Sequence, residues 1–178
     1  MHIHTSRLLL RDFRVDDHPA VHAFASDPEV TRYTEWGPNT PADTAAFLRD
    51  AVRDAGRRPR IRFALAVTDR ADQTLIGSVE LRVTNVAYQQ AGTGYALARP
   101  RWGEGLATEA AAAMLRLGFD QLGLHKIIAT CDPDNAGSAR VLTKIGMRQE
   151  GHLRDHVLIH GHWHDRLLFS ALKGDGPA

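Results

Sequence analysis

The chain has 178 residues, of which 43% are hydrophobic, and no low-complexity tract, so it suits one compact domain spanning residues 1–178. Its 22 basic and 21 acidic residues give a net charge of +1, which excludes a large electrostatic surface for nucleic acid or for a membrane. Its one cysteine, Cys131, excludes an internal disulfide framework and reads as a buried strand residue.

The first predicted elements are a strand over residues 3–13 and a helix over residues 15–25, whose start carries two aspartates. The segment at residues 26–28, Ser-Asp-Pro, ends that helix. A second helix is predicted between a cap at Thr40, followed by proline, and Gly56. Its core-facing stripe comprises Phe47, Leu48, Ala51, Val52 and Ala55.

Three strands follow as an antiparallel meander, over residues 62–68, 74–83 and 92–98. The rest of the chain alternates helix, strand, helix, strand and strand. This order predicts a single-domain α/β (α+β) fold, with a mixed, mostly antiparallel twisted sheet of about seven strands and helices on both faces.

The most informative motif is a glycine turn at residues 101–110, RWGEGLATEA, between a strand-like run and a helical pattern. Glycines at positions 103 and 105 let the backbone approach a ligand, and the first N–H groups of a helix point at an anion. The motif predicts a phosphate site, although an ordinary tight turn into a helix has the same pattern. The apolar face of the predicted helix comprises Leu106, Ala110, Ala113, Met114 and Leu117.

A second motif, DPDNAGSARVLTKIGM at residues 132–147, follows a strand-like run at residues 127–131. Together the two motifs resemble motifs A and B of the Gcn5-related N-acetyltransferase (GNAT) superfamily, and their wording is similar to that of its ribosomal-protein N-acetyltransferase (RimJ/RimL-like) subgroup. Residues 6–11 are similar to the family's first strand. Residues 150–155 and 161–165 are similar to its closing hairpin, so the resemblance covers most of the chain.

The resemblance implies an acyltransferase with a V-shaped notch for acetyl-CoA between two splayed strands. Where neighbouring strands diverge, main-chain groups lose their sheet partners and can pair with the pantetheine amides. The diphosphate is expected over the glycine turn. The implied cofactor contacts are Leu97, Ala98, Trp102, Gly103, Gly105, Leu106, Ala107, Thr108, Asn135, Ser138 and Arg140.

Three positions depart from the family pattern. Trp102 stands where many members carry Gln or Arg, and Leu142 replaces a tyrosine often assigned as the general acid. In the similar subgroup a serine takes that role, and Ser138 stands at its position. The acid that relatives often place before a glycine-tyrosine pair is replaced by Thr93. The candidate bases are therefore Glu80, Glu35 and His156.

Several of these residues have a structural alternative. Asn135 also suits a helix cap, Arg140 a solvated surface position, and Ser138 close packing of the helix. The segment at residues 33–38 resembles the family's acceptor-covering loop, but an aromatic surface loop fits equally. The candidate substrate contacts are Tyr33, Glu35, Trp36 and His156.

Two other features suggest no further ligand. His160, His162 and His164 alternate, yet Gly161 is expected to break the strand between them, so no metal is predicted. The arginine-rich residues 57–60 are most simply a solvated loop.

The first residues carry no cationic segment before a long apolar run, and no segment has the ~20 apolar residues of a membrane span, so we expect a cytoplasmic protein.

The sequence therefore favours acetyl transfer from acetyl-CoA to a primary amine, by direct attack in a ternary complex. The amine is either a protein N-terminus or a small molecule, and the resemblance implies a homodimer that completes the acceptor pocket. An acyl-CoA-binding or sensing module without turnover is the alternative. A Rossmann nucleotide-binding protein is disfavoured because the glycine turn follows an antiparallel meander, not a first parallel strand.

Overall fold

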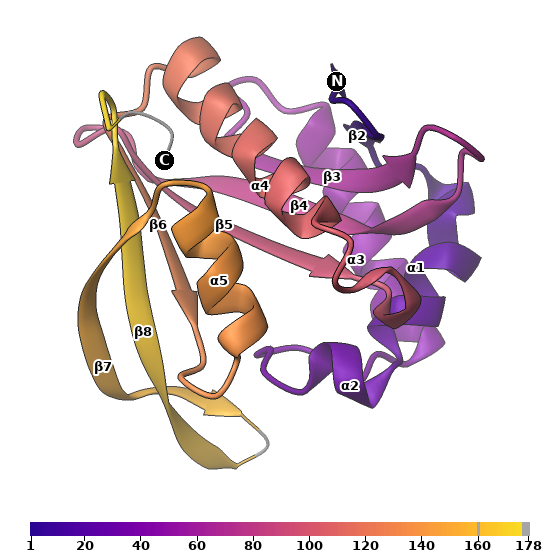
Figure 1. Cartoon of the computed structure of the whole chain (residues 1–178). Coiled ribbons are helices and arrows are strands. Elements are labelled where there is room, and N and C mark those ends of the chain that lie inside the picture. Colours follow the sequence, from indigo (N-terminus) through magenta and orange to yellow (C-terminus); the bar gives the residue numbers. More distant parts are fainter. Residues whose placement is uncertain (160, 176–178) are drawn as a thin grey trace.

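The computed structural model describes residues 1–159 and 161–175, which form one eight-stranded sheet with helices on both faces (Figure 1). The strands are β1 (His2–His4), β2 (Leu8–Asp12), β3 (Arg62–Asp69), β4 (Leu75–Asn85), β5 (Gln90–Leu97), β6 (Lys126–Cys131), β7 (Arg148–Ile159) and β8 (His162–Leu172). The α-helices are α1 (His18–Ala25), α2 (Pro28–Thr31), α3 (Pro41–Ala55), α4 (Leu106–Arg116) and α5 (Ala136–Lys144). Shorter helical turns are η1 (Val15–Asp17), η2 (Arg99–Arg101) and η3 (Leu117–Gln121).

The strand order is β1-β2-β3-β4-β5-β6-β8-β7, and every neighbouring pair is antiparallel except β5 and β6. The predicted mixed, mostly antiparallel sheet is confirmed. The single strand predicted over residues 3–13 is wrong, because the Thr5 N–H donates to the Leu8 carbonyl (2.9 Å) and turns the chain back on itself. Ile3 of β1 then lies opposite Leu10 of β2, so the sheet has eight strands where about seven were expected.

Two apolar layers hold the helices on the sheet. The α4 and α5 helices lie over one face, and α1 and α3 lie over the other (Figure 1). Alternate residues of the central strand β3 supply both layers: Leu65 packs in the cluster that contains Met114 of α4, while Ala64 packs in the cluster that contains Leu48 of α3. The predicted apolar face of α4 is confirmed, since all of its members are buried.

The α3 helix confirms both predicted boundaries and corrects one core position. Thr40 accepts a hydrogen bond from the Asp43 N–H and forms a capping box, and Gly56 ends the helix. Val52, however, is 38% exposed. It lies one residue past buried Ala51, which turns it about 100° around the helix axis and away from the sheet. The sequence also missed α2, whose first turn is capped by the Asp27 side chain.

The β7–β8 hairpin closes the sheet, as the sequence predicted, and β7 forms its outer edge. The pairing is irregular, with register shifts between Gln149 and Gly151 and between Leu153 and Val157. Asp155, in the second irregular stretch, has a positive φ of 45°. Among the described helices, none has the length and apolar character that crossing a membrane requires.

Candidate active site

The glycine turn connects β5 and η2 to α4 and exposes main-chain donors. Gly103 and Gly105 have φ angles of 81° and 76°, which favour glycine, and a Cβ at position 103 would meet no atom within 4 Å. The N–H groups of residues 103 to 108 donate to no acceptor in the described part of the chain. No side chain caps α4, whereas α2, α3 and α5 each begin with a capping side chain. Consecutive free donors at a helix start suit an anion.

The predicted cofactor contacts at positions 106 to 108 lie at the start of α4, and their main-chain N–H groups point toward the glycine turn. The Leu106 side chain is 2% exposed and belongs to the core, so only its main chain is open to a ligand. Ala107 and Thr108 are half-buried. The helix start thus combines an anchored side chain with N–H groups that point toward the turn.

The segment between β1 and β2 holds the turn in place. The Arg7 Nη1 donates to the Glu104 carbonyl (2.8 Å), and its Nε donates to the Glu109 carboxylate on α4 (2.7 Å). The same carboxylate accepts hydrogen bonds from the Thr5 and Ser6 hydroxyls and from the Arg7 N–H. Burial alone would raise the pKa of Glu109, but these hydrogen bonds lower it to about 2.

A cavity of about 330 Å³ opens beside the glycine turn. Arg7, Arg70 and Arg101 are among the residues that line it. Arg101 pairs with Asp69 (2.7 Å) and with Glu104 (3.1 Å), so its charge is already balanced within the protein. These ion pairs fix the outer side of the turn.

The notch lies where β5 and β6 separate. Their parallel pairing runs only from Gln90 opposite Lys126 to Gly92 opposite Ile128. Beyond Gly92 the two strands diverge, and α5 follows β6 back across the same side of the sheet (Figure 1). The splay that the resemblance implied is therefore present in the sheet.

Leu97 and Ala98, the predicted pantetheine contacts at the end of β5, have main-chain groups that point in opposite directions. The Ala98 N–H donates to the Ile76 carbonyl (2.8 Å) and so points toward β4. Because successive main-chain groups of a strand point to opposite sides, those of Leu97 point toward the notch. The Leu97 carbonyl accepts a hydrogen bond from the Trp102 indole N–H (2.8 Å), which gives Trp102 a main-chain partner at the base of the turn.

The α5 helix begins at the notch with Asn135 and Ser138. The Asn135 Oδ1 accepts the Ser138 N–H (3.0 Å), so Asn135 is the helix cap, and its Nδ2 has no partner among the described residues. The Ser138 Oγ lies 3.0 Å from the Tyr95 hydroxyl of β5. Burial raises the pKa of Tyr95 to about 12, although its hydrogen bond with Ser138 opposes that shift. Arg140 is exposed on the same helix.

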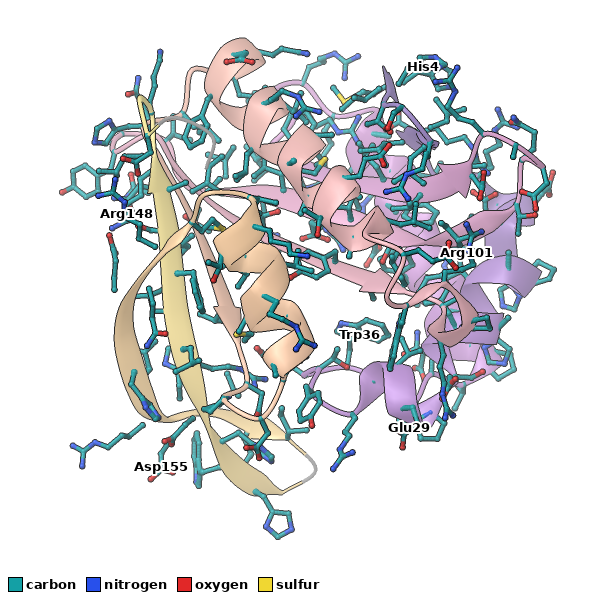
Figure 2. The ribbon with its side chains drawn as sticks, viewed as in Figure 1. His4, Glu29, Trp36, Arg101, Arg148 and Asp155 are labelled. Carbon is teal, nitrogen blue, oxygen red and sulfur yellow. The ribbon has the colours of Figure 1, made fainter. Side chains whose placement is uncertain are left out.

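The predicted acceptor loop joins α2 to α3. Tyr33 is half-buried, while Glu35 and Trp36 are exposed. In the view of Figure 2, Trp36 is seen between α5 and the turn that carries Arg101. The Arg166 Nη2 of β8 donates to the Tyr33 carbonyl (2.9 Å) and attaches this loop to the C-terminal part of the sheet.

A buried ion pair supports that attachment. Asp132, directly after β6, is 5% exposed, and its Oδ2 lies 3.1 Å from the Nη1 of Arg166, which is 3% exposed. The His164 Nδ1 lies 3.2 Å from the same oxygen. His156, a candidate base and substrate contact, is exposed in the irregular part of β7.

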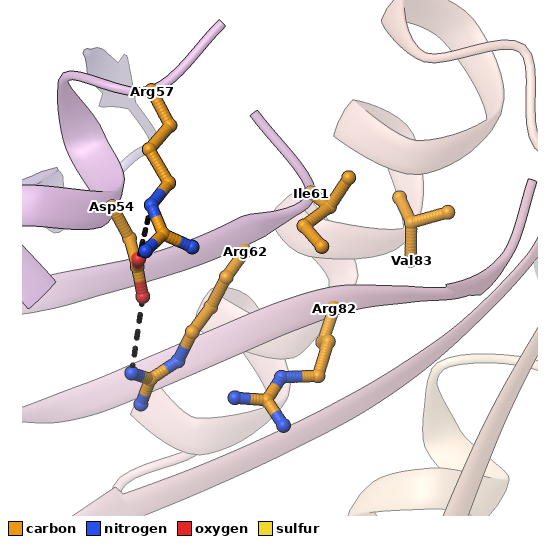
Figure 3. A pocket seen from close by; sticks show the side chains of 6 residues that line it. All are labelled: Asp54, Arg57, Ile61, Arg62, Arg82 and Val83. Carbon is orange, nitrogen blue, oxygen red and sulfur yellow. Dashed lines mark hydrogen bonds and ion pairs between the residues drawn. The ribbon is translucent and has the colours of Figure 1, made fainter. Parts of the chain in front are cut away.

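Glu80, the other candidate base, belongs to an ion-pair network on β4. Its carboxylate lies 2.8 Å from the Arg62 guanidinium and 3.6 Å from that of Arg82. Next to it, a cavity of about 160 Å³ contains Asp54 between Arg57 (3.4 Å) and Arg62 (3.3 Å) (Figure 3). Glu80 is therefore engaged by two guanidinium groups, that of Arg62 on the neighbouring strand β3 and that of Arg82 on β4 itself.

Sequence reasoning missed several residues at this site. Tyr95 follows a glycine in β5, but nothing in the sequence shows that it contacts a residue 43 positions later. Asp132 and Arg166 are likewise separated by 34 positions. Glu109 stands inside the glycine motif, yet its role in holding residues 5 to 7 depends on how the first strands fold.

No cluster of three metal-binding side chains occurs in residues 1–159 and 161–175. His164 contacts Asp132, and His152 Nε2 lies 2.6 Å from the Asp165 carboxylate. His160, one of the three alternating histidines, lies outside the described residues. Two of the described histidines, His152 and His164, thus each have a carboxylate partner.

Comparisons with known proteins agree with this geometry. A family model described as "Acetyltransferase (GNAT) domain" matches residues 7–148. The chain is 35% identical to an uncharacterized N-acetyltransferase, YnaD, of Bacillus subtilis, over 97% of this chain and 98% of that protein. An acetyltransferase (GNAT family) from Bacillus anthracis has a similar crystal structure, with a TM-score of 0.87, 32% identity and coverage of 98% and 99%. Mycobacterium smegmatis RimJ in complex with CoA-disulfide has a TM-score of 0.82, 27% identity and coverage of 96% and 84%.

Proposed function

The chain belongs to the acetyltransferase (GNAT) family and is an N-acetyltransferase, and on that premise we propose that it moves the acetyl group of acetyl-CoA to a primary amine by direct attack in a ternary complex. The observation that carries the proposal is the row of free N–H groups at residues 103 to 108. A diphosphate has the charge and size that such a row binds. The bound thioester supplies the activated acetyl group and a thiolate leaving group.

The rest of the notch suits the arm of the cofactor. The Leu97 N–H points toward the divergence of β5 and β6, where no strand pairs with it, while the Leu97 carbonyl already accepts the Trp102 indole N–H. The free Nδ2 of Asn135 adds a donor on the opposite side, and exposed Arg140 is available for the nucleotide phosphates. Asn135 thus serves as a helix cap through one atom and remains available to the cofactor through the other.

Ser138 is the residue we assign to the leaving group. Its Oγ lies on the first turn of α5 and can donate a hydrogen bond to a sulfur in the notch. A thiol with a pKa of about 8.5 is a good leaving group, so a weak donor such as a serine hydroxyl suffices. The serine therefore assists departure of the thiolate and does not need to be a strong acid.

The acceptor is an amine that is partly neutral without a strong base. An α-amine with a pKa of about 7.8 is ~15% neutral at pH 7, whereas a lysine amine with a pKa of about 10.4 is ~0.04% neutral. Glu80 already engages two arginines, which is a further reason to expect an acceptor that needs little help. We propose a protein N-terminus or a similarly weakly basic small-molecule amine.

Calorimetry with CoA and a thiol-release assay with an amine panel test this function. CoA should bind, and at pH 7 a peptide α-amine should react roughly 300- to 400-fold faster per complex than a lysine side-chain amine, in line with their neutral fractions. Binding without turnover across the panel would favour a non-catalytic acyl-CoA-binding module. Failure to bind CoA would contradict both the acetyltransferase and the non-catalytic acyl-CoA-binding module.

Substitution Ser138→Ala should lower kcat by roughly 10–100-fold and leave the CoA affinity almost unchanged, because it removes only a donor to the leaving group. Steady-state kinetics with saturating amine give kcat, and calorimetry gives the affinity. Thr143→Ala is the matched control, since it removes a hydroxyl from the exposed side of the same helix. An unchanged kcat in Ser138→Ala would return Ser138 to a packing role.

A further inference from the structure

The hydroxyl of Tyr95 lies across the notch from the position where β5 leaves β6. Strand pairing ends at Gly92, three residues before Tyr95, and the tyrosine side chain then reaches the first turn of α5. Its Oη lies 3.0 Å from the Ser138 Oγ and 3.2 Å from the Ser138 carbonyl. Tyr95 thus contacts the residue that the proposed function assigns to the leaving group.

Two hydroxyl groups in contact hold two hydrogens, and their arrangement decides what Ser138 can do. If Ser138 donates to Tyr95, the serine has no hydrogen left for a third atom. The single Tyr95 hydrogen can reach two acceptors, the Ser138 carbonyl at 3.2 Å and the Ser138 Oγ at 3.0 Å. When it is donated to the closer Oγ, the serine hydrogen is free to point into the notch. Because burial raises the pKa of Tyr95 to about 12, the phenol keeps its hydrogen throughout the neutral range.

We propose that Tyr95 is a positioning residue for Ser138: its O–H donates to the Ser138 Oγ, and this bond directs the serine hydrogen toward the leaving sulfur. The inference rests on the proposed function. The amine nitrogen bonds to the acetyl carbon, and the carbon–sulfur bond then breaks with its electron pair on sulfur, which Ser138 stabilises by donating a hydrogen bond while keeping its own hydrogen. The attacking amine releases one proton to solvent, and the departed thiolate, whose thiol has a pKa of about 8.5, takes one proton from solvent. Tyr95 holds the serine oxygen in place throughout.

A double-mutant cycle of Tyr95→Phe and Ser138→Ala tests the proposal. Tyr95→Phe should lower kcat about five- to tenfold, the effect of one neutral hydrogen bond, with an unchanged KM for acetyl-CoA. The double variant should be no slower than Ser138→Ala alone. The solvent deuterium isotope effect on kcat should fall in Tyr95→Phe to the value of Ser138→Ala, which loss of a structural contact would not produce. Tyr88→Phe is the matched control, since that ring is 69% exposed.

A second measurement observes the contact between Tyr95 and Ser138 directly and leaves the Tyr95 side chain untruncated. In a Tyr33→Phe, Tyr88→Phe background, 3-fluorotyrosine labels position 95 alone. Its fluorine resonance should shift when Ser138 is replaced by alanine in the ligand-free protein, because the label loses the serine hydroxyl and keeps only the carbonyl of residue 138 as an acceptor. The stronger donor should also raise kcat above that of the unlabelled background.

The outcomes separate this inference from the proposed function. If Ser138→Ala is slow but Tyr95→Phe is not, or if the two losses multiply in the double variant, Tyr95 does not act through Ser138 and the inference is wrong. A fluorine resonance that ignores Ser138→Ala has the same meaning. If Ser138→Ala itself keeps the parent kcat, the assignment of Ser138 fails first, and the inference fails with it.

Discussion

The Glu109 carboxylate shows how one residue couples charge to the shape of the glycine turn. Its pKa of about 2 lies below the usual value, so its ionised form favours the folded state above about pH 4.5, and that stabilisation is lost as the pH falls toward 2. Glu109→Gln should therefore lower the free energy of unfolding at pH 7 by roughly 2–3 kcal/mol. Urea unfolding at several pH values measures the difference, which should shrink below about pH 4.5.

Glu104→Gln is the control for that prediction, because this carboxylate is 43% exposed and pairs with Arg101 at the surface. Its loss should cost less than about 1 kcal/mol at any pH. A difference between Glu109→Gln and the parent that stays constant from pH 7 to pH 3 would contradict the role given to the Glu109 charge.

At the scale of an element, the start of α4 depends on two glycines with positive φ. Gly103→Ala and Gly105→Ala should each cost about 1–2 kcal/mol of stability, because an L-residue is strained there. Each should also weaken CoA binding by roughly tenfold, since a Cβ narrows the approach to the free N–H groups. Calorimetry measures the affinity. Gly151→Ala, in open space on β7 without a positive φ, should leave it unchanged; equal affinities in all variants would place the diphosphate elsewhere.

Elements with local signals could be predicted from the sequence. The cap at Thr40, the end at Gly56 and the apolar face of α4 depend on neighbouring residues, and the structure confirms them. The break between β1 and β2 could not be predicted, because residues 3 to 13 keep a strand-like pattern through the turn. The short α2 helix was also missed, since its one turn provides too little periodicity.

At the scale of the whole molecule, the two halves of the sheet share only the short β5–β6 pairing, and the Asp132–Arg166 pair adds a link to the Tyr33 loop. Asp132→Asn should lower the free energy of unfolding by about 3–5 kcal/mol, because it leaves a buried guanidinium without its counter-charge. Denaturant unfolding measures this loss. Asp134→Asn, an exposed neighbour, is the control, and adding Arg166→Met to Asp132→Asn should recover much of the stability. Equal stability of the two single variants would contradict the role of the pair.

Contacts between residues far apart in the chain are the parts of the site that could not be predicted from the sequence. The glycine turn and the start of α5 are continuous segments, so their resemblance to family motifs was enough to name expected cofactor contacts there. The contacts of Tyr95 with Ser138 and of Asp132 with Arg166 arise from the register of β5, β6 and β8. One sequence carries no direct signal for register between distant strands, so these pairs became visible only in the folded molecule.

The irregular outer strand β7 has a consequence for self-association. A long, flat edge would present a ladder of free main-chain groups to another chain and so invite aggregation by strand addition. The register shifts beside Gly151 and Val157, and the left-handed backbone at Asp155, interrupt that ladder. Any dimer of this protein should accordingly form through side-chain surfaces and not by extending the sheet at β7.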